Sequence, residues 1–180
     1  MGFNNSYIEF EKTNGRNRRG SAIVIGYGGA AKAIIFVLKQ MGFKKIKVFN
    51  RTFPDIKKLN QIEDKKYSTI EMYKLEELNK HTNHKENIKD KISLIVNTTP
   101  KNILGNSKKW NIGPNTWGFD VVYRPRGGTG FLKHFEPQNR IEGIQMLIYQ
   151  AAPCFHMWFG KNPKIDKGLL DTLYKKMELK

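Results

Sequence analysis

Short apolar runs alternate with stretches of helical spacing along this chain. Two runs, residues 21–26 and 44–50, frame a segment from 28 to 41 in which apolar residues recur every three or four positions. Runs of that length predict strands, and the segment between them predicts a helix that ends at Gly42. Further strands are expected at residues 67–70, 92–97, 116–122 and 140–142, and further helices from residue 52 and at 74–80, 128–135, 144–158 and 169–177.

This order of strands and helices defines the expected fold class. Strand, helix and strand in close succession form the repeating unit of a parallel sheet, because parallel neighbours need a crossover connection. We therefore expect an α/β protein of the Rossmann type, with a doubly wound, mainly parallel sheet and helices on both of its faces.

The charge of the chain raises nucleic-acid binding as one function. The 180 residues include 32 Lys and Arg against 16 Asp and Glu, a formal net charge of +16. Clustered cations neutralise nucleic-acid phosphates, but here the excess is spread over every part of the sequence. A generally positive surface equally attracts small anionic ligands.

Targeting and redox features predict a cytoplasmic protein. No apolar stretch approaches the roughly 18 residues that a membrane span requires, and residues 1–20 are polar. The single cysteine, Cys154, excludes an internal disulfide, and its apolar neighbours predict that it is a small core residue. The four histidines are scattered, so we expect no metal site, and His81 and His84 are expected to be solvated in a charged loop.

A glycine-rich turn follows the first predicted strand. Gly26, Gly28 and Ala31 fit the pattern G-x-G-x-x-A. In dinucleotide sites the first glycine makes the turn, the second lets a pyrophosphate approach the backbone, and the small third residue lets the helix pack on the sheet. The helix N-terminus then offers free N–H groups to the phosphates. A glycine turn without a ligand is the alternative explanation.

The residues at the end of the second predicted strand indicate which dinucleotide the site prefers. Sites that prefer NAD usually place a carboxylate here, whereas this chain has Asn50, Arg51 and Thr52. A guanidinium can donate two parallel hydrogen bonds to a 2′-phosphate. We therefore expect NADP(H) as the cofactor, and the alternative is that Arg51 is a solvated loop residue.

Five motifs in this order resemble a known family. They are GYGGAAKA at 26–33, NRT at 50–52, NTTP at 97–100, DVVYRP at 120–125 and GIQMLIYQAA at 143–152. Over about residues 2–160 the chain resembles the C-terminal half of the shikimate dehydrogenases, a pattern that quinate/shikimate dehydrogenases share. The resemblance implies an oxidoreductase of aromatic amino-acid (chorismate) biosynthesis that reduces 3-dehydroshikimate to shikimate with NADPH.

The resemblance also implies a domain organisation. Residues 1–20 correspond to a remnant of the inter-domain segment and a linker, 21–160 to the NADP-binding domain, and 161–180 to a C-terminal helix that packs on it. The N-terminal domain, which carries the substrate pocket and a catalytic lysine, is expected to be absent from this truncated chain.

Site residues follow from the same resemblance. Tyr123 and Gln150 match substrate-binding positions. Apart from the resemblance, each residue has a simpler explanation. Met146 on an apolar helix would be a core residue, and Tyr123 would cap the edge of the sheet. The polar side chain of Gln150 is harder to explain in this way, because it needs hydrogen-bond partners on an apolar helix. The cofactor positions are Gly26, Gly28, Gly29, Ala30, Ala31, Asn50, Arg51, Thr52, Asn97, Thr98, Thr99, Gly143 and Met146.

The chain departs from the family pattern at five positions. Ser6 stands where the family has its catalytic aspartate, and a serine offers no carboxylate, so no catalytic residue is assigned. Glu9 replaces a glycine nearby. Asn102 and Gln145 replace glycines beside the cofactor and are expected to crowd it, while Asp55 would oppose a 2′-phosphate.

Four hypotheses for function follow. The first is an NADP-dependent shikimate dehydrogenase present as its cofactor-binding half, which acts on shikimate or 3-dehydroshikimate together with a separate N-terminal half. The second is a catalytically dead dinucleotide-binding module or partner subunit. The third is a basic nucleic-acid-binding protein, and glutamyl-tRNA reductases are a minor fourth. An isolated half would expose the apolar wall of its cleft, so association into an oligomer is expected.

Overall fold

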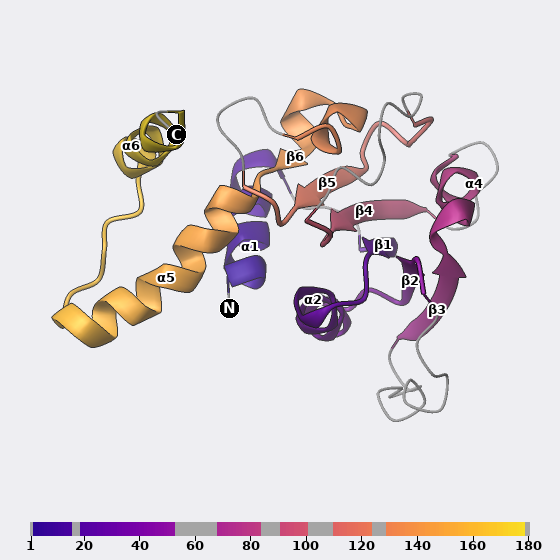
Figure 1. Ribbon diagram of the computed structural model, residues 1–180, viewed down its shortest axis with the longest axis horizontal. Coiled ribbons are helices and arrows are strands. Elements are labelled where there is room, and N and C mark those ends of the chain that lie inside the picture. Colours follow the sequence, from indigo (N-terminus) through magenta and orange to yellow (C-terminus); the bar gives the residue numbers. More distant parts are fainter. Residues whose placement is uncertain are drawn as a thin grey trace.

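One parallel sheet organises the chain. The computed structural model describes residues 2–15, 19–52, 68–83, 91–100, 110–123 and 129–178. Within these ranges a six-stranded sheet has the order β3-β2-β1-β4-β5-β6, and every neighbouring pair is parallel (Figure 1). This is the doubly wound order, so the predicted Rossmann-type α/β fold is confirmed. The strands are β1 Ser21–Ile25, β2 Lys45–Asn50, β3 Thr69–Lys74, β4 Ile92–Asn97, β5 Trp117–Asp120 and β6 Arg140–Ile141.

Helices lie on both faces of the sheet. The α-helices are α1 Gly2–Asn14, α2 Gly29–Gln40, α4 Leu78–Thr82, α5 Gly143–Phe159 and α6 Lys167–Glu178. Single 3-10 turns occur at η1 Leu75–Glu77, η3 Leu132–His134 and η4 Pro137–Asn139. The helices predicted at 28–41, 144–158 and 169–177 are therefore confirmed.

Three predicted elements differ from the structure. The strand expected at 67–70 is β3, which starts at Thr69 and continues to Lys74, and the helix expected at 74–80 is divided between η1 and α4. The helix expected at 128–135 is reduced to the turn η3, because the glycines around Gly130 favour an irregular backbone. The helix expected from residue 52 falls outside the described residues.

The central strands are buried on both faces, as parallel strands between two helical layers must be. All five residues of β1 are buried, and five of the six residues of β4. One face of the sheet packs against α1 and α2 through residues such as Tyr7 and Leu38. The other face packs against α4 and η3 through Leu78 and Leu132.

Helix α1 contributes to this core, although the polar residues from position 11 onward predict a link. Tyr7 is fully buried, and its ring lies 5.4 Å from that of Trp117 on β5. The rings of Phe3 and Phe119 lie 4.7 Å apart with a tilt of 46°, and Phe10 meets Trp117 edge-on at 4.8 Å. These rings recur every three or four residues on one side of α1, so aromatic burial outweighs the polar residues on the opposite side.

His81 is also more enclosed than its charged neighbours predict. Its ring lies 4.2 Å from that of Tyr73, and its Nδ1 accepts a hydrogen bond from the ammonium of Lys47 at 3.3 Å. Lys47 is only 2% exposed. Burial first and the Lys47 charge second lower the pKa of His81; Lys80 adds to this effect, whereas Glu77 and Glu71 oppose it.

This contact predicts a pH-dependent stability. Because the pKa of His81 is lower in the folded chain than its ordinary value of about 6.5, the unfolded chain takes up a proton first as the pH falls. The contribution of neutral His81 to the free energy of unfolding is therefore complete above the ordinary pKa. It is lost as the pH falls from the ordinary pKa to the lower pKa of the folded chain. His81→Gln keeps an acceptor and does not titrate, so we expect it to reduce the loss of stability between pH 7.5 and 5.5 in urea unfolding. The matched control His156→Gln, in an exposed position on α5, should leave that loss unchanged, and equal loss in all three proteins would contradict this account.

Candidate cofactor-binding site

The carboxyl ends of the central strands meet at one edge of the sheet. In the strand register Ile25 of β1 lies beside Asn97 of β4, and Asn97 lies beside Asp120 of β5. The chain order reverses between β1 and β4, and ligands of open α/β sheets bind outside the strand ends at that point. The fold therefore brings the motifs after β1, β2, β4 and β5 to one place.

The turn after β1 requires glycine at position 26. Gly26 has a φ of +99°, which other residues rarely adopt, and its N–H donates to the carbonyl of Phe49 at 2.7 Å. A Cβ at this position would lie 2.5 Å from the Oγ1 of Thr98. Thr98 cannot withdraw easily, because its N–H and its hydroxyl both donate to the carbonyl of Ile25.

The start of α2 forms an open cradle. Gly28 is the N-cap, with no side-chain capping hydrogen bond, and a Cβ on it would meet nothing within 4 Å. Gly29 and Ala30 are exposed in the first turn, whereas Ala31 is fully buried against the sheet. The first N–H groups of a helix have no partner within it and lie at the positive end of its dipole. These residues fit a pyrophosphate.

A lysine that the motif analysis missed adds a cation near this cradle. Lys32, exposed on the first turn of α2, places its ammonium 5.3 Å from the ring centroid of Tyr27. Partial burial raises the pKa of Tyr27, so the phenol stays neutral at ordinary pH. The only sequence signal was a lysine within the glycine motif.

The end of β2 presents the predicted adenosine-side residues. The side-chain amide of Asn50 donates to the carbonyl of Thr52 at 2.6 Å, which stabilises a bend directly after the strand. Arg51 and Thr52 are exposed at this bend. A guanidinium and a hydroxyl are thus accessible on the same edge as the glycine turn.

Asp120 links the ends of β4 and β5, a role that the sequence analysis did not assign. Its carboxylate accepts from the amide of Asn97 at 3.0 Å, from the N–H of Val122 at 3.0 Å and from the hydroxyl of Thr129. The carbonyl oxygen of the Asn97 amide accepts from both the N–H and the hydroxyl of Thr99. Asn97 and Thr99 are buried and Thr98 is half-buried, so these positions shape the edge from within. The available signal was a carboxylate at the end of a buried strand.

The start of α5 packs closely against the end of β5. A Cβ on Gly143 would lie 2.7 Å from the carbonyl oxygen of Asp120, which explains the glycine at this turn. Tyr123, which follows β5, is 52% exposed. Met146 is partly buried and packs against the core, as its apolar surroundings alone predict. Gln150 is exposed, so it needs no internal partner.

Two departures from the family pattern meet in space. Ser6 of α1 is fully buried, and its hydroxyl donates to the Oε1 of Gln145 on α5 at 3.4 Å. The helices approach closely here, since a Cβ on Gly2 would lie 2.6 Å from the carbonyl oxygen of Met146. The Gln145 side chain is therefore engaged with α1, and its crowding of the cofactor stays a prediction.

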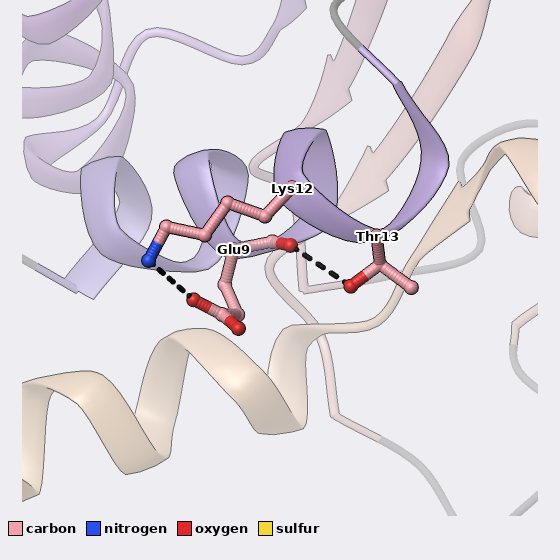
Figure 2. Close-up of polar contacts among 3 residues, drawn as sticks. All are labelled: Glu9, Lys12 and Thr13. Atoms are coloured by element: carbon pink, nitrogen blue, oxygen red, sulfur yellow. Dashed lines mark hydrogen bonds and ion pairs between the residues drawn. The ribbon is translucent and has the colours of Figure 1, made fainter.

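The neighbouring surface of α1 is charged (Figure 2). Glu9 pairs with Lys12 at 3.0 Å, and the Thr13 hydroxyl donates to the carbonyl of Glu9 at 3.2 Å. Burial raises the pKa of Tyr149 on α5, and Glu9 raises it further against the opposing effect of Lys12. Because Glu9 is paired with Lys12 and half exposed, it does not take the place of a buried carboxylate at position 6.

Cys154, Asp55 and Asn102 complete the residues that the sequence analysis singles out. Cys154 is exposed, so the prediction that it is a core residue is wrong. It lies in the second half of α5, a helix that runs away from the sheet (Figure 1). Asp55 and Asn102 lie outside the described residues. Among the residues that the structure describes, no group of three His, Cys, Asp or Glu side chains could hold a metal ion. Nor does any described helix have the length and hydropathy to span a membrane.

Comparisons with known proteins agree with this geometry. The family model described as shikimate / quinate 5-dehydrogenase matches residues 10–103. The shikimate dehydrogenase (NADP(+)) of Bartonella henselae is 30% identical over 168 residues, which cover 87% of this chain and 54% of that protein.

Solved structures share the fold. Shikimate 5-dehydrogenase from Listeria monocytogenes, in complex with shikimate and NAD, matches with a TM-score of 0.65 at 23% identity. The matched region covers 90% of this chain and 59% of the Listeria monocytogenes chain. Shikimate dehydrogenase 1 from Peptoclostridium difficile has a TM-score of 0.59 at 25% identity and covers 98% of this chain and 61% of its own.

The doubly wound sheet and the glycine turn at the carboxyl end of its central strand β1 define a Rossmann-type dinucleotide-binding fold. Within that class, the chain belongs to the shikimate / quinate dehydrogenase family, as the family match over more than half of its residues shows. It spans about half the length of the curated relatives that it matches.

Substitutions of the two glycines of the turn, Gly26 and Gly28, are expected to separate an effect on stability from an effect on cofactor binding. We expect Gly26→Ala to lower the free energy of unfolding by about 2–4 kcal/mol, because the new Cβ is strained and meets Thr98. Gly28→Ala should lower it by about 1 kcal/mol at most, because that Cβ enters open space and only the N-cap preference for glycine is lost.

The same Gly28→Ala change should weaken NADPH binding by roughly tenfold or more, since the Cβ occupies the space that a pyrophosphate approaches. Urea unfolding and calorimetric titration measure the two effects. A Gly28→Ala protein that is stable and binds NADPH normally would show that the open cradle is not the phosphate site.

Proposed function

We propose that this chain is the cofactor-binding half of an NADP-dependent shikimate dehydrogenase, which reduces 3-dehydroshikimate to shikimate in the cytoplasm. The observation that carries the proposal is the open N-terminus of α2 behind the Gly26 turn, on the same sheet edge as Arg51. Family membership supports the reaction class. The proposal assigns the catalytic residues to the portion of the relatives that this chain does not span.

The residues of this chain have distinct tasks in the proposal. Gly28, Gly29 and Ala30 bind the pyrophosphate through backbone N–H groups, and Lys32 adds a positive charge beside them. NADPH, when bound, supplies the hydride that reduces the substrate carbonyl. The buried network around Asp120 fixes the strand ends along which the rest of the cofactor lies.

Arg51 and Thr52 account for a preference for the phosphorylated cofactor. Both are exposed at the bend after β2, where NAD-specific proteins place a carboxylate. The relative from Bartonella henselae is named for NADP(+), whereas the structure from Listeria monocytogenes contains NAD, so the choice cannot be carried over from relatives. The exposed guanidinium of this chain favours NADP.

Tyr123 and Gln150 are the proposed substrate contacts. Both side chains are exposed, one after β5 and one on α5, and both can donate hydrogen bonds to the hydroxyl groups of a polyol. These residues do not distinguish shikimate from quinate, and the family description includes both.

Changing Arg51 tests the cofactor part of the proposal. A hydrogen bond to a charged group contributes about 1.5–3 kcal/mol, so Arg51→Ala should weaken NADPH binding by roughly 10- to 150-fold. Binding of NADH, which lacks the 2′-phosphate, should change by less than about twofold. Titration of both proteins with both cofactors gives the comparison. An equal loss for the two cofactors, or none for NADPH, would remove Arg51 from the phosphate site.

A second candidate function is a dinucleotide-binding module without turnover. The specific observation in its favour is Ser6, which is buried and bound to Gln145 at the position where the family has its catalytic aspartate. A serine in this environment neither carries charge nor accepts a proton at neutral pH.

Turnover decides between the two candidates. The chain is mixed with, or fused behind, the part of the Bartonella henselae relative that it does not span, and NADPH oxidation with 3-dehydroshikimate is followed at 340 nm (the absorbance of reduced nicotinamide). The enzyme proposal predicts turnover in the unaltered chain. The module predicts none, even for Ser6→Asp combined with Gln145→Gly. The control Thr13→Asp adds a carboxylate to the exposed side of α1 and should change nothing.

A further inference from the structure

Tyr27 and Lys32 form a pair at the start of α2. Tyr27 directly precedes the N-cap residue Gly28, and the ammonium of Lys32 lies over its ring, 5.3 Å from the centroid. At this distance a cation is attracted to the face of a tyrosine. Tyr27 packs against the core on this side of the sheet, whereas Lys32 is exposed. The ring is thus fixed in place, and it gives the flexible lysine side chain one preferred position.

Helix geometry brings this position to the open end of α2. Lys32 follows Gly28 by four residues, so the two residues lie on the same face of the helix, one turn apart. Side chains in a helix lean toward its N-terminus, which directs the lysine back over Gly28. The contact with Tyr27 shows that the Lys32 side chain takes this direction. The ammonium therefore lies at the end of α2 where the first N–H groups are open.

A cation at this end is the reverse of the charge that stabilises a helix. The helix dipole favours acidic side chains at the N-terminus and cations at the C-terminus. Residues 29–32, the first turn of α2, include no Asp or Glu, and no carboxylate among the described residues forms an ion pair with Lys32. Lys39, in the last turn, has the favourable placement. Lys32 and the first N–H groups together make a concentrated positive site that suits an anion.

We propose that Tyr27 is a positioning residue for the cofactor. Its ring holds the Lys32 ammonium at the N-terminus of α2, where the ammonium binds the pyrophosphate. The pair then acts on a group that NADPH and NADH share, in contrast to Arg51, which acts on the 2′-phosphate. The glycine motif by itself contributes backbone N–H groups, and the pair adds a side-chain charge to them. This inference rests on the proposed function, because it concerns the same cofactor.

The ring matters because it prepares the lysine for the ligand. An exposed lysine side chain samples many rotamers, and fixing it on an anion costs conformational entropy. The contact with Tyr27 restricts the side chain beforehand, which reduces this cost on binding. The same contact offsets the repulsion between the ammonium and the positive end of the helix. Loss of the ring should therefore weaken binding only in a chain that carries Lys32.

A double-mutant cycle in the full chain tests this coupling. The variants are Tyr27→Leu, Lys32→Gln and the two combined. Binding of NADPH and NADH is measured by calorimetry, and binding of inorganic pyrophosphate by phosphorus NMR. Lys32→Gln should weaken binding of each ligand by about tenfold, because it removes a charged contact to the pyrophosphate. Tyr27→Leu should weaken it by about two- to fivefold when Lys32 is present, and should have no further effect in the Lys32→Gln chain.

Two matched variants separate positioning from other roles. Tyr27→Phe keeps the ring, so it should bind pyrophosphate within about twofold of the unaltered chain. Lys39→Gln removes the same charge about 10 Å further along α2, where salt screens it from the ligand, and should change binding by less than about twofold. Urea unfolding without ligand checks that every variant is folded. A merely structural role of Tyr27 would weaken binding equally with and without Lys32.

The outcomes distinguish this inference from the proposed function. Equal losses from Tyr27→Leu with and without Lys32, or no loss from Lys32→Gln, would overturn the inference even if the unaltered chain binds NADPH. A loss confined to NADPH would overturn it as well, because it would assign the pair to the 2′-phosphate. Coupled binding of pyrophosphate without binding of either dinucleotide would support the pair while the proposed function fails. A folded chain that binds none of these ligands would overturn both.

Discussion

The close contact between Gly26 and Thr98 determines where the carboxyl edge of the sheet can bind a ligand. With a φ of +99° and the Thr98 hydroxyl 2.5 Å from the position of a Cβ, the chain leaves β1 in one direction only. That direction starts α2 at Gly29 and leaves its first N–H groups open. The hydrogen bond from the Thr98 hydroxyl to the carbonyl of Ile25 keeps the end of β4 beside β1. The hydrogen bond from the Asn97 amide to Asp120 then holds the end of β5 beside β4. A single turn thus aligns every strand end on which the proposed cofactor site depends.

The sequence predicts this part of the molecule well, because its signals are local. A buried strand, a glycine turn and an amphipathic helix each follow from residues within a few positions of one another, as for β1, Gly26 and α2. The long-range contacts are harder. Asp120 accepts a hydrogen bond from Asn97, which lies 23 positions earlier on another strand, and the side chain of Gln145 accepts one from Ser6, a residue 139 positions away. No local pattern shows such pairs.

Burial is the property that sequence patterns predict least reliably here. Residues 2–14 look polar in their second half but supply Tyr7 and Phe10 to the core, whereas the far half of α5 looks like a core helix and is exposed except at the half-buried Ala152. Both outcomes have one physical origin. Apolar spacing shows that a face needs cover but not which surface provides it, and for α5 the described chain provides none. The described residues therefore bury the central strands on both faces and leave most of the far part of α5 exposed.

The central claim is that this chain binds a phosphorylated dinucleotide at the carboxyl edge of its sheet. The most direct test is a calorimetric titration of the purified 180-residue chain with NADPH, and with NADH in parallel. The account predicts one site per chain that binds both cofactors through the open helix N-terminus and binds NADPH at least tenfold more tightly, since Arg51 acts on the 2′-phosphate that NADH lacks. A folded chain that binds neither cofactor would contradict it, and the family relationship would then describe ancestry without activity.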